Sequence, residues 1–167
     1  KVTEPKAPSG VVGTGALFAI NNDADPSLIA FRYRIKDAAV DVAEEPFEAG
    51  GKKFNRGSFL VKNASQADVQ KYATQLGLQA HALAAAPTVK THAVKSPRIG
   101  YIHTWIGTQD EGWWRMEFDR LKIPYDYVST QVVAKDANLN GRWDVIVFPP
   151  VGGDDAILGI TRAAAAT

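Results

Sequence analysis

The segment of residues 98–150 constrains the fold more than any other part of the chain. It starts with an apolar run that ends at Trp105, continues with a helical pattern from Thr108, and closes with a second apolar run at 143–148. Strand, helix and strand in this order are typical of a βαβ unit, in which a helix joins two parallel strands. All four tryptophans also lie in this segment.

A helix is predicted to begin at Thr108. Thr108 and Glu111 have the spacing of a capping box, in which two side chains satisfy backbone N–H groups at a helix start. Trp114, Phe118 and Leu121 then recur at helical spacing on one narrow face. This pattern indicates that the helix packs against a sheet.

The first half of the chain also alternates strand and helix signals. Residues 28–35 fit a helix preceded by the N-cap and first-turn pair Asp25-Pro26, although apolar and basic residues alternate there as they would in a strand. The strongest helix signal covers residues 65–76, where Ser65 is the expected cap, and Gly77 is expected to end it. The remaining predicted elements are strands at 16–20, 40–43, 54–61, 78–83, 125–128 and 145–148, the last of them buried, and a short helix at 130–134.

Strands that alternate with helices predict an α/β fold with a mostly parallel sheet and helices on both faces, flavodoxin-like or amidotransferase-like. Residues 1–13 are expected to be a linker, 14–86 a first α/β half and 98–160 a second. Residues 87–97 lack periodicity and are expected to connect the halves. The alternative is one continuous domain over 14–160.

Composition excludes several classes of site and partner. With no cysteine, the chain cannot supply a disulfide, a thiolate metal ligand or a cysteine nucleophile. A net charge of +1 gives no footprint for nucleic acid, and no apolar run approaches the length of a membrane span. We therefore expect neither a nucleic-acid partner nor a membrane-spanning segment.

Several segments carry a family resemblance. Residues 97–105 and 108–115, together with 43–48 and 54–59 upstream, resemble a region of large secreted bacterial zinc carboxypeptidases of the carboxypeptidase A-like family. In these proteins the peptidase domain is followed by a region similar to class I glutamine amidotransferases. The resemblance implies a periplasmic or extracellular location and a peptidase domain of the same polypeptide as partner.

The residues needed for the family's chemistry are missing from this chain. The peptidases bind zinc through a His-x-x-Glu pair and a later histidine. Here His81, His92 and His103 are each followed at that spacing by a residue other than glutamate. The resemblance therefore implies that zinc belongs only to the absent peptidase domain, that this chain holds no cofactor, and that it has no catalytic residues of its own.

A ligand site is predicted in the loop from His103 to Trp113. This loop joins the carboxyl end of a strand to the start of a helix, where open α/β sheets usually bind ligands. His103, Thr104, Trp105, Gln109 and Trp113 are the predicted binding residues for a small polar or sugar-like ligand, with tryptophan as a stacking face. The competing interpretation is that Trp105, Trp113 and Trp114 pack the sheet against its helices and that His103 makes a local hydrogen bond.

Residues 136–141 match the start of a calcium loop, D-x-N-x-N-G, but the position of the closing bidentate carboxylate is Val147. The sequence favours a turn there, with no metal bound. The weak calcium candidates are Asp136, Asn138, Asn140 and Asp144.

Taken together, these patterns predict a non-catalytic accessory domain of a zinc carboxypeptidase-like protein, with a structural or substrate-admitting role. The alternative is a small-ligand or carbohydrate-binding module that uses the Trp105–Trp113 loop.

Overall fold

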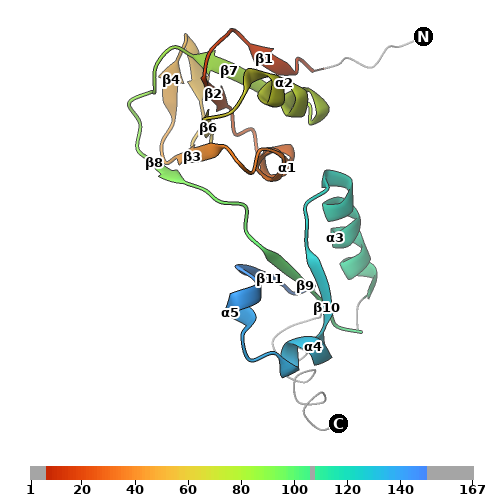
Figure 1. Cartoon of the computed structure of the whole chain (residues 1–167). Helices are drawn as coiled ribbons and strands as arrows, with labels where there is room; N and C mark the ends of the chain where they lie inside the picture. The colour runs from red at the N-terminus through yellow and green to blue at the C-terminus, as the bar shows by residue number, and fades with distance from the viewer. Residues whose placement is uncertain (1–6, 106–107, 150–167) are drawn as a thin grey trace, which may run out of the picture. The chain divides into compact units, whose positions relative to one another are not determined.

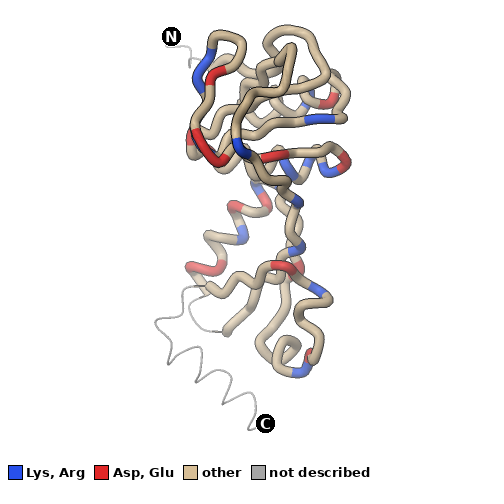
Figure 2. The backbone as a smooth tube through the Cα atoms, turned by 90° about the vertical axis from the view of Figure 1, so that its left-hand side faces the viewer, with Lys and Arg blue, Asp and Glu red and all other residues tan. Residues whose placement is uncertain are grey.

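The computed structural model describes residues 7–105 and 108–149, and the chain divides into two compact units (Figure 1). Unit 1 is Lys1–Ser96 and unit 2 is Pro97–Thr167. Basic and acidic residues are interspersed along the backbone of both units (Figure 2). None of the helices in the described ranges combines the length and hydropathy that a bilayer crossing requires.

Unit 1 is built on a six-stranded sheet of order β1-β7-β2-β6-β3-β8. Only β1 and β7 pair in parallel, and the other neighbouring strands are antiparallel. The strands are β1 (Gly10–Val12), β2 (Leu17–Ile20), β3 (Ala39–Ala43), β6 (Phe59–Lys62), β7 (Gln79–Leu83) and β8 (Thr91–Ala93). The remaining elements are the helices α1 (Ser27–Arg34) and α2 (Gln66–Gln75) and the hairpin of β4 (Phe47–Ala49) and β5 (Lys52–Phe54).

The predicted mostly parallel sheet with helices on both faces is wrong. Strand β2 lies between β6 and β7 and runs antiparallel to both, so the strands that α2 connects are separated by a third strand. The same holds for β2 and β3, which α1 connects and β6 separates. This is the β-α-β-β-α-β connectivity of ferredoxin-like split βαβ units. Strand–helix alternation was correctly recognised, but it does not specify which strands are neighbours.

Both helices cover one face of the sheet. Phe31 of α1 and Val69 of α2 are fully buried against Phe18 and Val61 of the strands. The opposite face is covered by the β4–β5 hairpin, where Phe47 and Phe54 stack at 4.8 Å between ring centroids. The hairpin thus takes the place that the sequence assigned to a second layer of helices.

Local signals set the helix ends as predicted. Ser65 Oγ accepts a hydrogen bond from the Asp68 backbone N–H at 3.0 Å, which caps α2. Gly77 follows the helix with φ of +70°, a conformation that glycine adopts at little cost. The helical interpretation of residues 28–35 is also confirmed, by α1.

Three short stretches depart from the predicted organisation of unit 1. Gly10–Val12, inside the predicted linker, forms β1 beside β7. Thr91–Ala93, inside the predicted connector, forms β8 beside β3. The predicted strand 54–61 is broken at Gly57, whose φ of +86° turns the chain between β5 and β6. Edge strands of three residues are too short to show a hydrophobic period.

Unit 2 contains a three-stranded parallel sheet of order β10-β9-β11. Its elements are β9 (Ile99–His103), α3 (Thr108–Leu121), β10 (Asp126–Ser129), α4 (Thr130–Lys135), α5 (Leu139–Arg142) and β11 (Val145–Val147). Helix α3 packs on the sheet through Phe118, whose ring meets Tyr101 edge-on at 5.9 Å. The prediction that β11 is buried is wrong, because Val145 and Ile146 are 43% and 40% exposed. The end of the predicted second half, 150–160, lies outside the described residues.

Candidate functional site

His103 is the last residue of β9, the central strand of the unit 2 sheet. Both neighbouring strands run parallel to β9, so their carboxyl ends meet at the same edge of the sheet. Helix α3 starts five residues later, at Thr108. The edge where His103 lies is the one at which parallel α/β sheets bind ligands.

A buried carboxylate fixes the imidazole of His103. His103 Nδ1 lies 3.0 Å from Glu111 Oε2 and 3.2 Å from Oε1, and Glu111 is only 2% exposed. The Tyr127 hydroxyl lies 2.8 Å from the same ring nitrogen and donates a hydrogen bond to Glu111 Oε1. We call these three residues the His103 cluster.

The hydrogen bonds of the His103 cluster assign the tautomer of its imidazole. Glu111 can only accept, so Nδ1 carries a hydrogen and donates it to the carboxylate. Nε2 then has a lone pair, and it makes no hydrogen bond to any residue in the described ranges. A ligand at this edge of the sheet would meet an oriented imidazole nitrogen.

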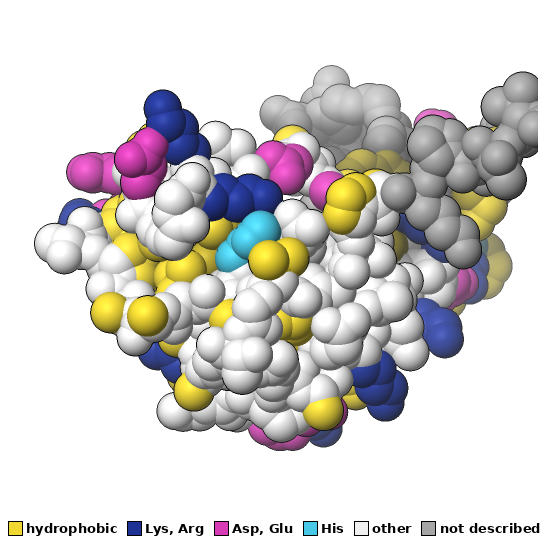
Figure 3. Space-filling model, turned by 90° about the horizontal axis from the view of Figure 1, so that it is seen from above, with side chains coloured by type: hydrophobic (Ala, Val, Ile, Leu, Met, Phe, Trp, Pro, Cys, Tyr) yellow, Lys and Arg dark blue, Asp and Glu magenta, His cyan; other side chains and the backbone are white. Residues whose placement is uncertain are grey.

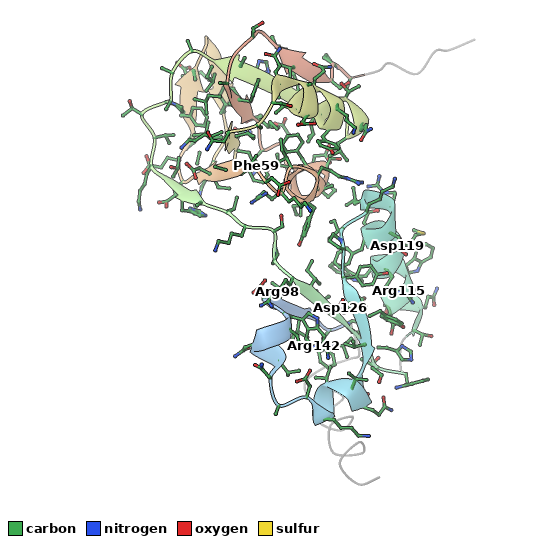
Figure 4. The ribbon with its side chains drawn as sticks, viewed as in Figure 1. Phe59, Arg98, Arg115, Asp119, Asp126 and Arg142 are labelled. Carbon is green, nitrogen blue, oxygen red and sulfur yellow. The ribbon has the colours of Figure 1, made fainter. Side chains whose placement is uncertain are left out.

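The tyrosines near the cluster remain protonated at neutral pH. Burial, followed by the hydrogen bond to Glu111, raises the pKa of Tyr127 above its ordinary value. Burial and the charge of Glu111 raise the pKa of Tyr101 to about 12. Arg115, labelled in Figure 4, lies 4.0 Å over the Tyr127 ring and adds a cation–π contact. Tyr127 is therefore held as a hydrogen-bond donor.

Trp105 packs against the imidazole of His103. Its ring meets the imidazole at 4.2 Å between centroids, yet 64% of the residue is exposed. Its indole N–H donates to Gln131 Oε1 at 3.1 Å, and its φ is +65°. A left-handed conformation costs a bulky residue on the order of 1 kcal/mol, and such strain concentrates at functional sites. The result is a fixed aromatic face open to solvent.

The other predicted ligand residues are placed differently. Thr104 is 1% exposed, inside the fold. Gln109 and Trp113 stand two residues before and after Glu111 on α3, which puts both about 160° away from its buried side chain. Both are exposed, Trp113 at 58%. The structure thus brings His103 and Trp105 together but leaves Gln109 and Trp113 on the far face of the helix.

Glu111, Tyr127 and Gln131 were not among the predicted site residues. The sequence explained Glu111 as half of a capping box, but its carboxylate is bonded to His103 and Tyr127. A usable signal was present: a carboxylate in the first turn of a helix, eight residues after a histidine that ends a strand. Tyr127 and Gln131 carry no comparable signal, because β10 and α4 reach the site only through the sheet register.

The competing interpretation is wrong for the tryptophans, although the local hydrogen bond that it expected of His103 is made, to Glu111. Trp105, Trp113 and Trp114 are each more than half exposed. Trp143 is the buried one, at 4%, and its indole N–H donates to Asp126 Oδ2 at 2.8 Å.

The carboxylates of the weak calcium candidate form ion pairs with Arg98 and Arg142, both labelled in Figure 4. Asp136 Oδ2 accepts from Arg142 Nη1 at 3.0 Å, and Asp144 accepts two hydrogen bonds from the Arg98 side chain, at 2.9 and 3.1 Å. The Asn138 side chain caps α5 through the Gly141 N–H, and the backbone carbonyl of Asn140 accepts from Arg98. Within the described ranges, no group of three or more acidic, histidine or cysteine side chains is placed to hold a metal ion.

Comparisons with protein-family models, curated proteins and solved structures find no match to this chain.

Proposed function

We propose that unit 2 is a non-catalytic binding module for a small polar or sugar-like ligand, and that the His103 cluster with Trp105 is its site. The observation that carries the proposal is an exposed, strained tryptophan lying over an imidazole that a buried carboxylate holds in one orientation. An exposed aromatic face stacks on the apolar face of a sugar ring or a flat polar ligand. His103 Nε2 then provides the polar contact that sets orientation and specificity.

The hydrogen bonds of the site favour binding over catalysis. A general base needs an adjacent nucleophile or a positioned water, and within the described ranges the His103 imidazole hydrogen-bonds only to Glu111 and Tyr127. Glu111 is 2% exposed and shares its oxygens with His103 and Tyr127, so it is no free acid or base. The module would recognise its ligand and leave the chemistry to another domain.

We further infer that this chain is an accessory part of a larger secreted zinc carboxypeptidase-like protein. Support comes from the sequence resemblance together with the missing His-x-x-Glu pair. Binding at the His103 cluster would then help to admit or retain substrate near the peptidase domain.

Tryptophan fluorescence during titration with monosaccharides and short peptides tests the binding function. Trp105→Ala should weaken the affinity at least about tenfold, because it removes the stacking face. Trp113→Ala is the matched control, since it removes an exposed tryptophan of the same unit from the far side of α3. Equal losses in both variants, or no response in the parent chain, would refute the proposal.

The accessory role is tested by measuring zinc content and carboxypeptidase activity of this chain. We expect neither bound zinc in stoichiometric amount nor release of C-terminal amino acids. Stoichiometric zinc with turnover would show that the chain is a peptidase itself.

A further inference from the structure

Unit 1 has a cavity of about 260 Å³ at the end of its sheet where β2 stops and β7 begins. The β4–β5 hairpin covers the adjoining part of this face, and the cavity opens beside it. Its polar lining comes from Asn21, Asp23, Asp25, Lys52, Gln79 and His81. Figure 3 shows a histidine beside a basic side chain on this unit, with acidic side chains close by.

One wall of the cavity is rich in hydrogen-bond donors. Gln79 and His81 alternate along β7 and so point to the same face of the sheet, where the Lys52 ammonium bridges them. Lys52 Nζ lies 2.9 Å from His81 Nε2 and 3.2 Å from Gln79 Oε1. Because an ammonium only donates, Nε2 is the acceptor and the imidazole hydrogen lies on Nδ1.

Donor capacity remains on this wall after the internal contacts are made. An ammonium has three N–H groups, and the described residues use two of those of Lys52. The Nδ1–H of His81 and the amide N–H₂ of Gln79 have no hydrogen-bond acceptor in the described part of the chain. A carboxylate is the group that accepts from a lysine and two neutral donors at once.

The lining of the same cavity also carries acceptors. Asp23 Oδ1 accepts from the Asn21 side chain at 2.6 Å, and Asp25 Oδ1 accepts from the Ser27 backbone N–H at 2.8 Å. The second oxygen of each carboxylate has no hydrogen-bond donor within the described ranges. Two carboxylates with an acceptor atom each to spare suit a cationic ammonium group.

We propose that this cavity binds a free amino acid, with the carboxylate on Lys52 and His81 and the ammonium on Asp23 and Asp25. Donors and acceptors that line one cavity fit a zwitterion better than a simple anion, which the aspartates would repel, or a simple cation, which Lys52 would repel. The volume is below the roughly 300–1,000 Å³ of drug-sized ligand pockets, which suits a ligand as small as one amino acid.

The test uses NMR of the whole chain with labelled histidines and titrations of glycine, alanine, serine and lysine. Acetate and methylammonium are the half-ligands that carry one charge each. The variant is Lys52→Met, and the matched control is Lys53→Met, because Lys53 is the next residue of the same strand and its side chain is 87% exposed in a contact with Glu48. Thermal unfolding of both variants checks that the hairpin stays folded.

The expected result is that at least one amino acid shifts the His81 resonances at concentrations up to about 10 mM. Both half-ligands should bind at least tenfold more weakly than that amino acid. Lys52→Met should lose the response and Lys53→Met should keep it. Asp25→Asn retains the acceptor for the Ser27 N–H. It should weaken the binding of the amino acid at least about threefold and should not weaken the binding of acetate. No shift of His81 with any of the four amino acids, acetate binding as well as they do, or equal loss in both lysine variants would overturn the proposal.

Discussion

The two units differ in how completely they bury their apolar side chains. In unit 1 both faces of the sheet are covered, by α1 and α2 on one side and by the β4–β5 hairpin on the other. Of the ten large hydrophobic residues that are exposed within the described ranges, two lie in unit 1 and eight in unit 2. Unit 1 therefore derives its stability from a closed core, whereas unit 2 leaves aromatic surface available for contacts.

His81 and His103 also differ, in which of their ring nitrogens is bonded to a charged partner. His81 in unit 1 accepts from Lys52 through Nε2, which leaves its Nδ1–H for a ligand. His103 in unit 2 donates to Glu111 through Nδ1, which leaves its Nε2 lone pair. A cationic partner thus makes one histidine a donor to ligands, and an anionic partner makes the other an acceptor.

The largest expected effect is on the closed core of unit 1. Phe31→Ala removes a fully buried ring between α1 and the sheet and should cost about 3–5 kcal/mol of unfolding free energy. Ile29→Ala on the same helix is the control, because Ile29 is 55% exposed and its loss should cost below about 1 kcal/mol. Urea unfolding followed by far-UV circular dichroism measures both. Equal costs would mean that the core is not closed over α1.

The next effect concerns the buried carboxylate of unit 2. Glu111→Ala leaves the Tyr127 hydroxyl and the His103 Nδ1–H without their acceptor. It should lower the unfolding free energy of unit 2 by about 2–3 kcal/mol. Tryptophan fluorescence reports this unit alone, since all four tryptophans belong to it. Glu117→Ala, which removes a carboxylate of α3 that pairs with Arg120 at the surface, should leave the unfolding midpoint nearly unchanged. A Glu111→Ala protein as stable as the parent would contradict the hydrogen-bonded cluster.

A smaller effect on stability is expected from alanine substitutions at two glycines of unit 2, Gly100 and Gly112. A Cβ at Gly100 would lie 2.6 to 2.9 Å from the Trp143 ring, so Gly100→Ala should destabilise the unit by about 1–3 kcal/mol. A Cβ at Gly112 would meet nothing within 4 Å, and Gly112→Ala should stabilise α3 by about 0.5–1 kcal/mol. The midpoint of fluorescence-monitored urea unfolding should therefore move in opposite directions. Movement in the same direction would refute the packing of Trp143 on β9.

The sequence predictions were accurate where the interacting residues lie close together in the sequence, and inaccurate where they lie far apart. Helix α2 was predictable because its signals are local: Ser65 caps it, Gly77 ends it, and its apolar residues recur at helical spacing. Sheet order was not predictable, because β2 pairs with β6 and β7, which lie some 40 to 60 residues away. Helical spacing also placed Trp114 on the face of Phe118 and Leu121, but spacing alone cannot show that it lies at the edge of that face, half exposed.

The same distinction divides the candidate site. His103 and Trp105 could be predicted because a strand end followed by a helix start is a local pattern. Tyr127 reaches His103 only because β10 pairs in register with β9, and Lys52 reaches His81, 29 positions further along the chain, through the hairpin. Neither pair has a sequence signature, since both depend on which strands become neighbours.

The smallest expected effect is a pH dependence of the unfolding free energy of unit 1, caused by His81. Burial, followed by the charge of Lys52, lowers the pKa of His81 below its ordinary 6.5, so the unfolded chain takes up this proton more readily than the folded one. The resulting stability is complete above about pH 6.5 and is lost as the pH falls from there through the folded pKa. NMR titration of His81 should give a pKa below the ordinary value. Lys52→Met should raise this pKa, because it removes the charge of Lys52. Lys53→Met should leave the pKa of His81 unchanged. A His81 that titrates at or above its ordinary pKa in the parent chain would mean that the Lys52 ammonium does not bond to the imidazole, and the contrast with His103 would fail with it.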